Sequence, residues 1–361
     1  DRYRVVALSC HQNITLALKQ VKEFQPKYLV VGSRKAALKL KDELPPKTSL
    51  LVGEEELAHL AALPEVDLVV NALVGSAGLK ATLAAIISGK TLALANKESL
   101  VAGGSLVKKA LSQSKAKILP VDSEHNALFQ CLQGENLNEV ANLIITASGG
   151  PFLNYSQEQL KQVTVKQALA HPRWQMGAKI TVDSATLLNK AFEVIEAHYL
   201  FNLPYEQIKV LVHPQSIIHG LVEFIDGSIK AHIGPTNMKT AILYCLSYPQ
   251  RLTSFTRLDL TSLPSLELKP LNEDNFVCFK LALTAIKKSE AHLVALNASN
   301  EEAVKAFLEE KISFLDIAKV IATVLEAQSP APINSYEDFL AVDQKSRLLA
   351  QKYLKERVLT L

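Results

Sequence analysis

Six short runs rich in β-branched residues alternate with segments of helical spacing up to about residue 120, and this alternation constrains the fold most. In the intervening segments 13–24 and 33–44, apolar residues recur every three or four positions. Strands separated by helices of this length form mostly parallel sheets. We therefore predict an α/β protein that opens with a doubly wound, Rossmann-like domain. The predicted strands are 4–8, 28–32, 49–52, 68–73, 91–95 and 118–121.

At 361 residues the chain is too long for a single hydrophobic core. After about residue 122 the pattern changes. Extended runs mixed with helical stretches predict an α+β domain, with strands at 140–146, 208–213, 217–224 and 228–233. A proline-containing stretch of little periodicity predicts a linker, and the helical spacing after it predicts a bundle. We expect that bundle to be interrupted at 297–300 and 329–332. The predicted units are a nucleotide-binding domain 1–122, a catalytic domain 123–247, a linker 248–274 and a C-terminal helical domain 275–361.

Composition excludes several classes of function. The net charge is only +3, and lysines and arginines are scattered among acidic residues, which disfavours nucleic-acid binding. The four cysteines lie far apart without metal-binding spacing, which indicates a reducing compartment and no zinc site. Charged residues interrupt every apolar run before it reaches the roughly 18 residues of a membrane helix. We expect a protein of the cytoplasm, or of a plastid-type compartment in a eukaryote, with no membrane partner.

Two carboxylates follow the predicted strand 118–121. Asp122 and Glu124 are two residues apart, and on an extended backbone their side chains point the same way. They could equally be a solvated acidic pair at the end of a strand. If they converge, both can bind one cation.

The segment 181–200 supplies a third carboxylate. We predict one amphipathic helix that begins at the capping residues Asp183 and Ser184. Asn189, Lys190 and Glu193 then share one face. An exposed ion pair between Lys190 and Glu193 is one interpretation. The other makes Glu193 a metal ligand beside the two earlier carboxylates, with Ser184, Asn189 and Lys190 donating hydrogen bonds to a phosphate.

Three carboxylates without cysteine or paired histidine form a hard, oxygen-rich site. Such a site suits Mg²⁺ or Mn²⁺, with Co²⁺ as a further candidate, rather than Zn²⁺.

Residues 148–178 have the features of a lid. Ser148 and two glycines end an apolar run and let backbone amides approach an anion, although a plain turn explains them too. A long charged stretch follows, and then His171 and the only tryptophan, Trp174. Further along, His213 and His219 lie in an apolar strand, where a structural and a functional role explain them almost equally well.

Together these motifs resemble the 1-deoxy-D-xylulose 5-phosphate reductoisomerase family, in order and spacing, across essentially the whole chain. The segments that carry the resemblance are Asn-Lys-Glu-Ser at 96–99, Asp-Ser-Glu-His-Asn at 122–126, Ser-Gly-Gly-Pro-Phe at 148–152, His-Pro-Arg-Trp at 171–174, Asp-Ser-Ala-Thr at 183–186, Asn189, Lys190, Glu193, and His-Pro-Gln-Ser at 213–216.

The resemblance implies an NADPH-dependent and metal-dependent enzyme. It would rearrange deoxyxylulose phosphate and reduce the resulting aldehyde to methylerythritol phosphate, in non-mevalonate isoprenoid biosynthesis. It also implies a homodimer that fosmidomycin inhibits.

The resemblance also assigns roles to particular residues. It makes Asp122, Glu124 and Glu193 the metal ligands, and Lys97, Glu124 and His171 catalytic residues. The implied substrate contacts are Ser123, Glu124, Ser148, His171, Trp174, Ser184, Asn189, Lys190 and Glu193. The implied NADPH contacts are Asn13, Asn96, Lys97, Glu98, Gly177 and Met238.

Two departures from the family pattern concern the cofactor. The family's glycine-rich loop is absent. Because the sequence begins Asp-Arg-Tyr-Arg, without an initiator Met, and runs directly into the apolar residues 5–8, we expect that loop in a preceding strand and helix. Gln12 carries no charge where the family often has Lys or Arg near the 2'-phosphate. Two alternatives remain: a metal-free Rossmann-type reductase, which leaves three carboxylates unexplained, and a non-catalytic phosphosugar-binding protein.

Overall fold

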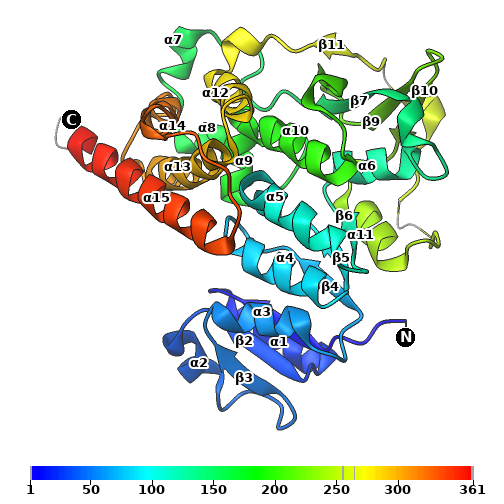
Figure 1. Ribbon diagram of the computed structural model, residues 1–361, viewed down its shortest axis with the longest axis vertical. Helices are drawn as coiled ribbons and strands as arrows, with labels where there is room; N and C mark the ends of the chain where they lie inside the picture. Colours follow the sequence, from blue (N-terminus) through cyan, green and yellow to red (C-terminus); the bar gives the residue numbers. More distant parts are fainter. Residues whose placement is uncertain (1, 254–255, 264, 359–361) are drawn as a thin grey trace.

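The computed structural model describes residues 2–253, 256–263 and 265–358 (Figure 1). Its N-terminal part contains two three-stranded parallel sheets, ordered β1-β2-β3 and β4-β5-β6. The six predicted strands are confirmed, but between β1 and β4 there is no ladder, so they form two sheets instead of one. The strands are β1 (Ala7–Cys10), β2 (Tyr28–Val31), β3 (Ser49–Val52), β4 (Leu68–Asn71), β5 (Thr91–Leu94) and β6 (Lys117–Pro120).

Helices connect these parallel strands, as the apolar spacing predicted. Helix α1 begins after Asn13, whose side chain accepts a hydrogen bond from the Leu16 amide and so satisfies one free N–H of the first turn. The apolar faces of α3 and α4 pack together where the two sheets meet (Figure 1). The connecting helices are α1 (Ile14–Phe24), α2 (Arg34–Leu40), α3 (Glu55–Ala62), α4 (Gly78–Ile87) and α5 (Glu98–Ser112).

The middle of the chain forms a five-stranded mixed sheet in the order β10-β9-β7-β8-β11. Strands β7 and β8 are parallel and the other neighbours are antiparallel. Strand β11 lies in the segment predicted as a linker and pairs with β8. Helices α6 (Ser123–Cys131) and α10 (Leu188–Phe201) contact this sheet. The strands are β7 (Val140–Ala147), β8 (Ile208–Val212), β9 (Ile218–Phe224), β10 (Ile229–Ile233) and β11 (Lys269–Pro270).

The helix predicted over 181–200 is two helices, so this prediction was wrong. Leu187 has a left-handed backbone with φ of +59° and separates α9 from α10. Asp183 and Ser184 therefore lie in the last turn of α9, and they do not cap a helix. The helices not yet named in this region are α7 (Gln157–Leu160), α8 (Val165–Ala168), α9 (Ala178–Ala185) and α11 (Met238–Ser247), with 3₁₀ turns at Leu137–Glu139, Tyr205–Gln207, Leu260–Ser262 and Glu273–Asn275.

The C-terminal part is helical: α12 (Val277–Ile286), α13 (Glu290–Leu308), α14 (Asp316–Ala327) and α15 (Tyr336–Val358). The interruption at 329–332 is confirmed, whereas the one predicted at 297–300 was wrong. Helix α13 continues there because Asn297 and Asn300 donate side-chain hydrogen bonds to Glu301 and Asp183. Among the residues described, no helix has the length and apolar character needed to cross a bilayer.

Candidate active site

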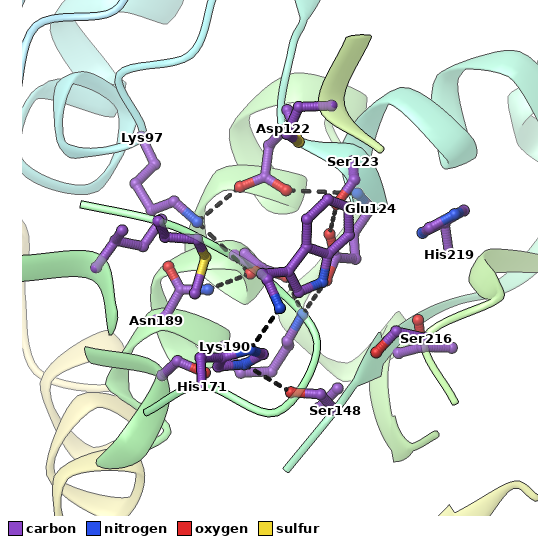
Figure 2. A pocket seen from close by; sticks show the side chains of 18 of the residues that line it. Lys97, Asp122, Ser123, Glu124, Ser148, His171, Asn189, Lys190, Ser216 and His219 are labelled. Atoms are coloured by element: carbon purple, nitrogen blue, oxygen red, sulfur yellow. Dashed lines mark hydrogen bonds and ion pairs between the residues drawn. The ribbon is translucent and has the colours of Figure 1, made fainter. Parts of the chain in front are cut away.

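A cavity of about 320 Å³ opens where the ends of β5, β6 and β7 face α9 and α10 (Figure 2). The strand ends contribute the loops that follow Leu94, Pro120 and Ala147. Every side chain predicted to bind metal or substrate, or to be catalytic, lines this cavity, namely Lys97, Asp122, Ser123, Glu124, Ser148, His171, Trp174, Ser184, Asn189, Lys190 and Glu193.

Three carboxylates converge on one side of the cavity. Asp122 caps the N-terminus of α6, Glu124 lies in its first turn, and Glu193 comes from α10. The backbone after Asp122 is helical, so the argument from an extended strand was wrong, although the side chains still meet. Oxygens of Asp122, Glu124 and Glu193 lie within 4.8 Å of one another. This set of hard oxygen donors fits Mg²⁺ or Mn²⁺.

Two buried lysines offset this negative charge. Lys97 Nζ lies 2.6 Å from Asp122 Oδ2, and Lys190 Nζ lies 2.7 Å from Glu124 Oε1. Lys190 also contacts Glu193, and because these two residues are 5% and 1% exposed, the exposed-pair interpretation was wrong. Burial, and then the charge of Glu124, raise the pKa of Glu193 to about 7. A divalent cation would relieve that repulsion.

The loop after β7 brings two serines to the cavity. Gly149 and Gly150 both have positive φ, and a Cβ on Gly150 would lie 2.6 Å from the Ser184 carbonyl oxygen. Only glycine therefore lets this loop pack so closely on the end of α9. Ser148 and Ser184 both line the cavity as a result.

His171 is held in one tautomer at this loop. Its Nδ1 accepts hydrogen bonds from the Arg173 and Trp174 amides, at 3.2 and 2.9 Å. Its Nε2 lies 3.2 Å from Ser148 Oγ, so Nε2 carries the proton and can donate. Burial lowers the pKa of His171, which favours the neutral ring.

Three of the residues predicted to bind the phosphate lie around the break between α9 and α10. Ser184 lies in the last turn of α9, and Asn189 and Lys190 lie in the first turn of α10. The helix start that could face an anion is therefore that of α10, not of a helix beginning at Asp183.

The predicted cofactor contacts are placed unevenly. Lys97 and Met238 line the cavity. Asn96 is not among the lining residues, and its side-chain amide donates hydrogen bonds to the Leu73 and Gly75 carbonyls. Three others do not line it: Glu98 pairs with Lys179 at 2.8 Å, Gly177 precedes α9, and Asn13 caps α1.

Ser216 and His219 are among the further residues that line the cavity without having been assigned to it from the sequence. His219 lies 6.4 Å from Trp174, ring centre to ring centre. The polar residues within the apolar run 213–219 were the available signal. His213 is structural by its contacts, because its Nε2 accepts hydrogen bonds from the Ile217 and Ile218 amides and its Nδ1 contacts the Glu267 carbonyl.

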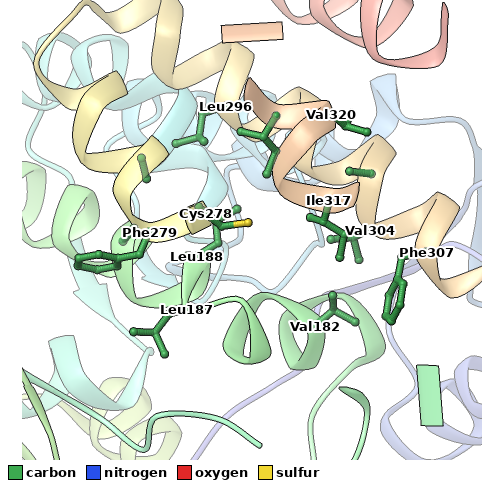
Figure 3. Close-up of a cluster of buried hydrophobic side chains, with 14 of the residues drawn as sticks. Val182, Leu187, Leu188, Cys278, Phe279, Leu296, Val304, Phe307, Ile317 and Val320 are labelled. Atoms are coloured by element: carbon green, nitrogen blue, oxygen red, sulfur yellow. The ribbon is translucent and has the colours of Figure 1, made fainter. Parts of the chain in front are cut away.

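A large apolar cluster includes residues on both sides of the break between α9 and α10 (Figure 3). Leu187 and Leu188, at the break, are buried beside Phe279 of α12 and Leu296 of α13. Burial of each of these side chains contributes about 2 kcal/mol to the stability of the folded chain. The C-terminal helices therefore fix the turn that carries Asn189 and Lys190.

Comparison with known proteins decides the family. The profile described as 1-deoxy-D-xylulose 5-phosphate reductoisomerase matches residues 1–104, and its C-terminal domain profiles match 118–201 and 233–349. The chain belongs to the 1-deoxy-D-xylulose 5-phosphate reductoisomerase family. A reductoisomerase of Halothermothrix orenii is 49% identical, with 98% of this chain and 92% of that protein covered. One of Chlorobium chlorochromatii is 46% identical, with 98% and 93% covered.

Solved reductoisomerases share the fold. A crystal structure in complex with NADPH, fosmidomycin and magnesium has a TM-score of 0.92 at 41% identity, covering 98% of this chain and 92% of that one. The Zymomonas mobilis reductoisomerase in complex with NADPH has a TM-score of 0.90, with the same identity and coverage.

Proposed function

We propose that this reductoisomerase converts 1-deoxy-D-xylulose 5-phosphate to 2-C-methyl-D-erythritol 4-phosphate, using NADPH and a divalent metal ion, in non-mevalonate isoprenoid biosynthesis. The observation that carries the proposal is the convergence of Asp122, Glu124 and Glu193 in the same cavity as Ser184, Asn189 and Lys190. A metal-free reductase would not need three carboxylates in one place, where they repel one another. A relative bound to NADPH, fosmidomycin and magnesium supports the same assignment.

The anion-binding side of the cavity would hold the substrate phosphate. Lys190 supplies a positive charge, and the Ser184 hydroxyl and the Asn189 amide supply neutral donors. The Ser148 hydroxyl, held by the His171 ring, would donate to the same group. Binding the phosphate there orients the rest of the sugar toward the carboxylates.

The reacting end of the sugar would lie beside Lys97, Ser123 and Glu124. When bound, a divalent cation held by the three carboxylates supplies Lewis-acid polarisation of a carbonyl and a neighbouring hydroxyl. The ammonium group of Lys97 stabilises negative charge that develops on substrate oxygens. Glu124 is placed to accept or return a proton of a substrate hydroxyl.

Trp174 and Met176 would cover the bound chain as part of a lid over 148–178. Both line the cavity from the segment just before α9. Closing this segment would exclude water while a reactive aldehyde is present. Asn96, Glu98, Gly177 and Met238 would position NADPH for hydride transfer, with Asn13 toward the far end of the cofactor.

The proposed assembly is a homodimer. Strand β10 is an edge of the five-stranded sheet within the described residues, and Ile229 and Ile233 on it are 54% and 45% exposed. An apolar edge of this kind is suited to pairing with a second copy. The proposed location is the cytoplasm, or a plastid-type compartment in a eukaryote, in keeping with four cysteines that are all free.

Loss of NADPH absorbance on adding deoxyxylulose phosphate tests the function. We expect oxidation that needs Mg²⁺ or Mn²⁺ and stops with EDTA. Oxidation unaffected by EDTA would favour a metal-free reductase. Binding of the phosphosugar and NADPH without oxidation, at any metal concentration, would favour a non-catalytic protein.

A further inference from the structure

A cluster of charges connects the C-terminal helix to the strand ends of the N-terminal region. Arg347 of α15 pairs with Asp343 on its own helix, at 2.7 Å from Nε to Oδ2. It also pairs with Glu301 of α13, at 2.7 Å from Nη2 to Oε2. The Arg347 side chain is 22% exposed and that of Glu301 is 19% exposed. Ion pairs this far withdrawn from solvent are screened less than surface pairs.

The same cluster reaches the loop that follows β4. Arg347 Nη2 donates to Ser76 Oγ at 3.0 Å, across 271 residues of sequence. The Ser76 amide donates to Glu301 Oε1 at 2.9 Å. Glu301 is itself fixed by Arg347 and by Asn297, whose amide donates to it at 2.8 Å. The Glu301 carboxylate thus binds the loop after β4, and the Arg347 guanidinium fixes the position of that carboxylate.

The backbone of this loop is shaped for that contact. Gly75 has a φ of +75°, and a Cβ there would lie 2.7 Å from Glu301 Oε1. Glycine is therefore required both for the left-handed backbone and for the close approach of the carboxylate. The position of Glu301 and the conformation of Gly75 depend on each other.

Asn96, which follows β5, also contacts this loop. The Asn96 amide donates to the Leu73 carbonyl at 2.7 Å and to the Gly75 carbonyl at 2.9 Å. It also donates to Glu98 Oε2 at 3.1 Å. The loop thus lies between the Arg347 cluster and two of the proposed NADPH contacts, so a shift of Gly75 shifts the acceptors of Asn96.

We propose that Arg347 is a positioning residue for the cofactor site: through Glu301 and Ser76 it fixes the loop after β4, and through that loop the side chain of Asn96. The C-terminal helical region thereby contributes to NADPH affinity without touching the cofactor. Arginine suits this role because its planar fork donates to Asp343, Glu301 and Ser76 at once. The inference rests on the proposed use of NADPH.

The test compares the whole protein with Arg347→Met, Arg347→Lys and Gln351→Ala. Gln351 lies on the same helix and donates to Glu302 Oε2 at 3.1 Å, whereas Arg347 lies 3.4 Å from the other oxygen of that carboxylate. Among the described residues, Gln351 makes no hydrogen bond to Glu301 or Ser76, which makes it the matched control for those two contacts. Three quantities are measured: amide hydrogen exchange at Ser76 without cofactor, the Kd for NADPH by fluorescence, and the KM for deoxyxylulose phosphate.

In Arg347→Met, we expect exchange at Ser76 to become about tenfold faster and the Kd for NADPH to rise about tenfold, as loss of one such contact would give. The KM for the phosphosugar should stay within about twofold, since its contacts lie elsewhere. Arg347→Lys should fall between wild type and Arg347→Met, and Gln351→Ala should match wild type. Unchanged exchange and Kd in Arg347→Met, or an equal effect in Gln351→Ala, would overturn the proposal.

Two further measurements distinguish failure of this proposal from a variant that does not fold and from failure of the proposed function. If Arg347→Met does not fold, Ser76→Ala removes only the Oγ contact, and it should still accelerate exchange in the loop and weaken NADPH binding about threefold. Wild-type exchange and affinity in Ser76→Ala would then count against the proposal. If wild type itself does not bind NADPH, the proposed function fails, whereas exchange at Ser76 still decides whether Arg347 fixes the loop.

Discussion

Lys97 Nζ lies 2.6 Å from Asp122 Oδ2, and with side chains 6% and 11% exposed this ion pair joins the ends of β5 and β6. Although burial by itself lowers the pKa of Lys97, Asp122 and Glu193 raise it well above its ordinary value. The lysine therefore stays charged and neutralises the carboxylates before a metal ion enters. We propose that a divalent cation bound by these carboxylates would take over part of this role, so that the lysine and the metal ion would neutralise the same negative charge.

Lys97→Met tests that sharing. Without the ammonium group, the carboxylates of the metal-free site repel one another more strongly, so the Tm without metal should fall by several degrees. Mg²⁺ should then raise the Tm by more than it does in wild type, while turnover is lost. Differential scanning calorimetry with and without Mg²⁺ measures both effects, and Lys80→Met, at an exposed position of α4, is the control. A smaller Mg²⁺ increment than in wild type would show that Lys97 assists metal binding instead.

Glu193→Gln tests the metal site from the carboxylate side. The amide keeps the shape, so the Tm without metal should change little or rise, because burial and Glu124 already raise the pKa of Glu193 to about 7. Losing one anionic ligand should weaken Mn²⁺ binding by at least about tenfold and abolish turnover. Calorimetric titration with Mn²⁺ checks this, with Glu206→Gln on the surface as the control. Wild-type affinity and near-normal turnover would remove Glu193 from the ligand set.

The strands, and the gathering of polar side chains at their ends, were predictable because their signals are local. A β-branched run followed by Asp122 or Asn96 indicates a buried strand that ends in polar groups, and parallel topology gathers such ends at one edge. The break at Leu187 was not predictable, because its left-handed backbone falls on a leucine where such breaks usually carry Gly or Asn. What holds it is the burial of Leu187 against the C-terminal helices, a contact between distant segments.

Long-range partners explain the other wrong predictions. Asn297 and Asn300 predicted an interruption of the helix, because asparagine usually favours helix ends. In the structure Asn300 donates to Asp183, which is 117 residues away, so the polar side chain is satisfied inside the helix. In the same way Lys190 is buried because Glu124, 66 residues earlier, pairs with it. The spacing of residues along the sequence indicates neither of these two long-range contacts.

Glu98→Gln should flatten the response of stability to acid. Although burial by itself raises the pKa of Glu98, Lys179 lowers it below its ordinary value. The unfolded chain therefore binds this proton more readily, and the stabilisation is present at neutral pH and lost as pH falls through the folded pKa. Urea unfolding from pH 7 to 3.5 should show a wild-type advantage over Glu98→Gln that shrinks below about pH 4.5. An advantage that stays constant or grows on acidification would contradict this pairing.

Gln25→Gly should stabilise the protein slightly, far from the active site. Gln25 ends α1 in a left-handed conformation with φ of +46°, and its side chain is exposed. A residue with a Cβ costs about 1 kcal/mol in this conformation, and glycine avoids that cost while it gives the unfolded chain more entropy. The net gain should be about 0.5 kcal/mol in the free energy of unfolding, measured by urea titration. Gln25→Ala keeps the Cβ and the strain, so it should give no gain; an equal gain in both variants would place the effect in the lost glutamine side chain and not in the backbone.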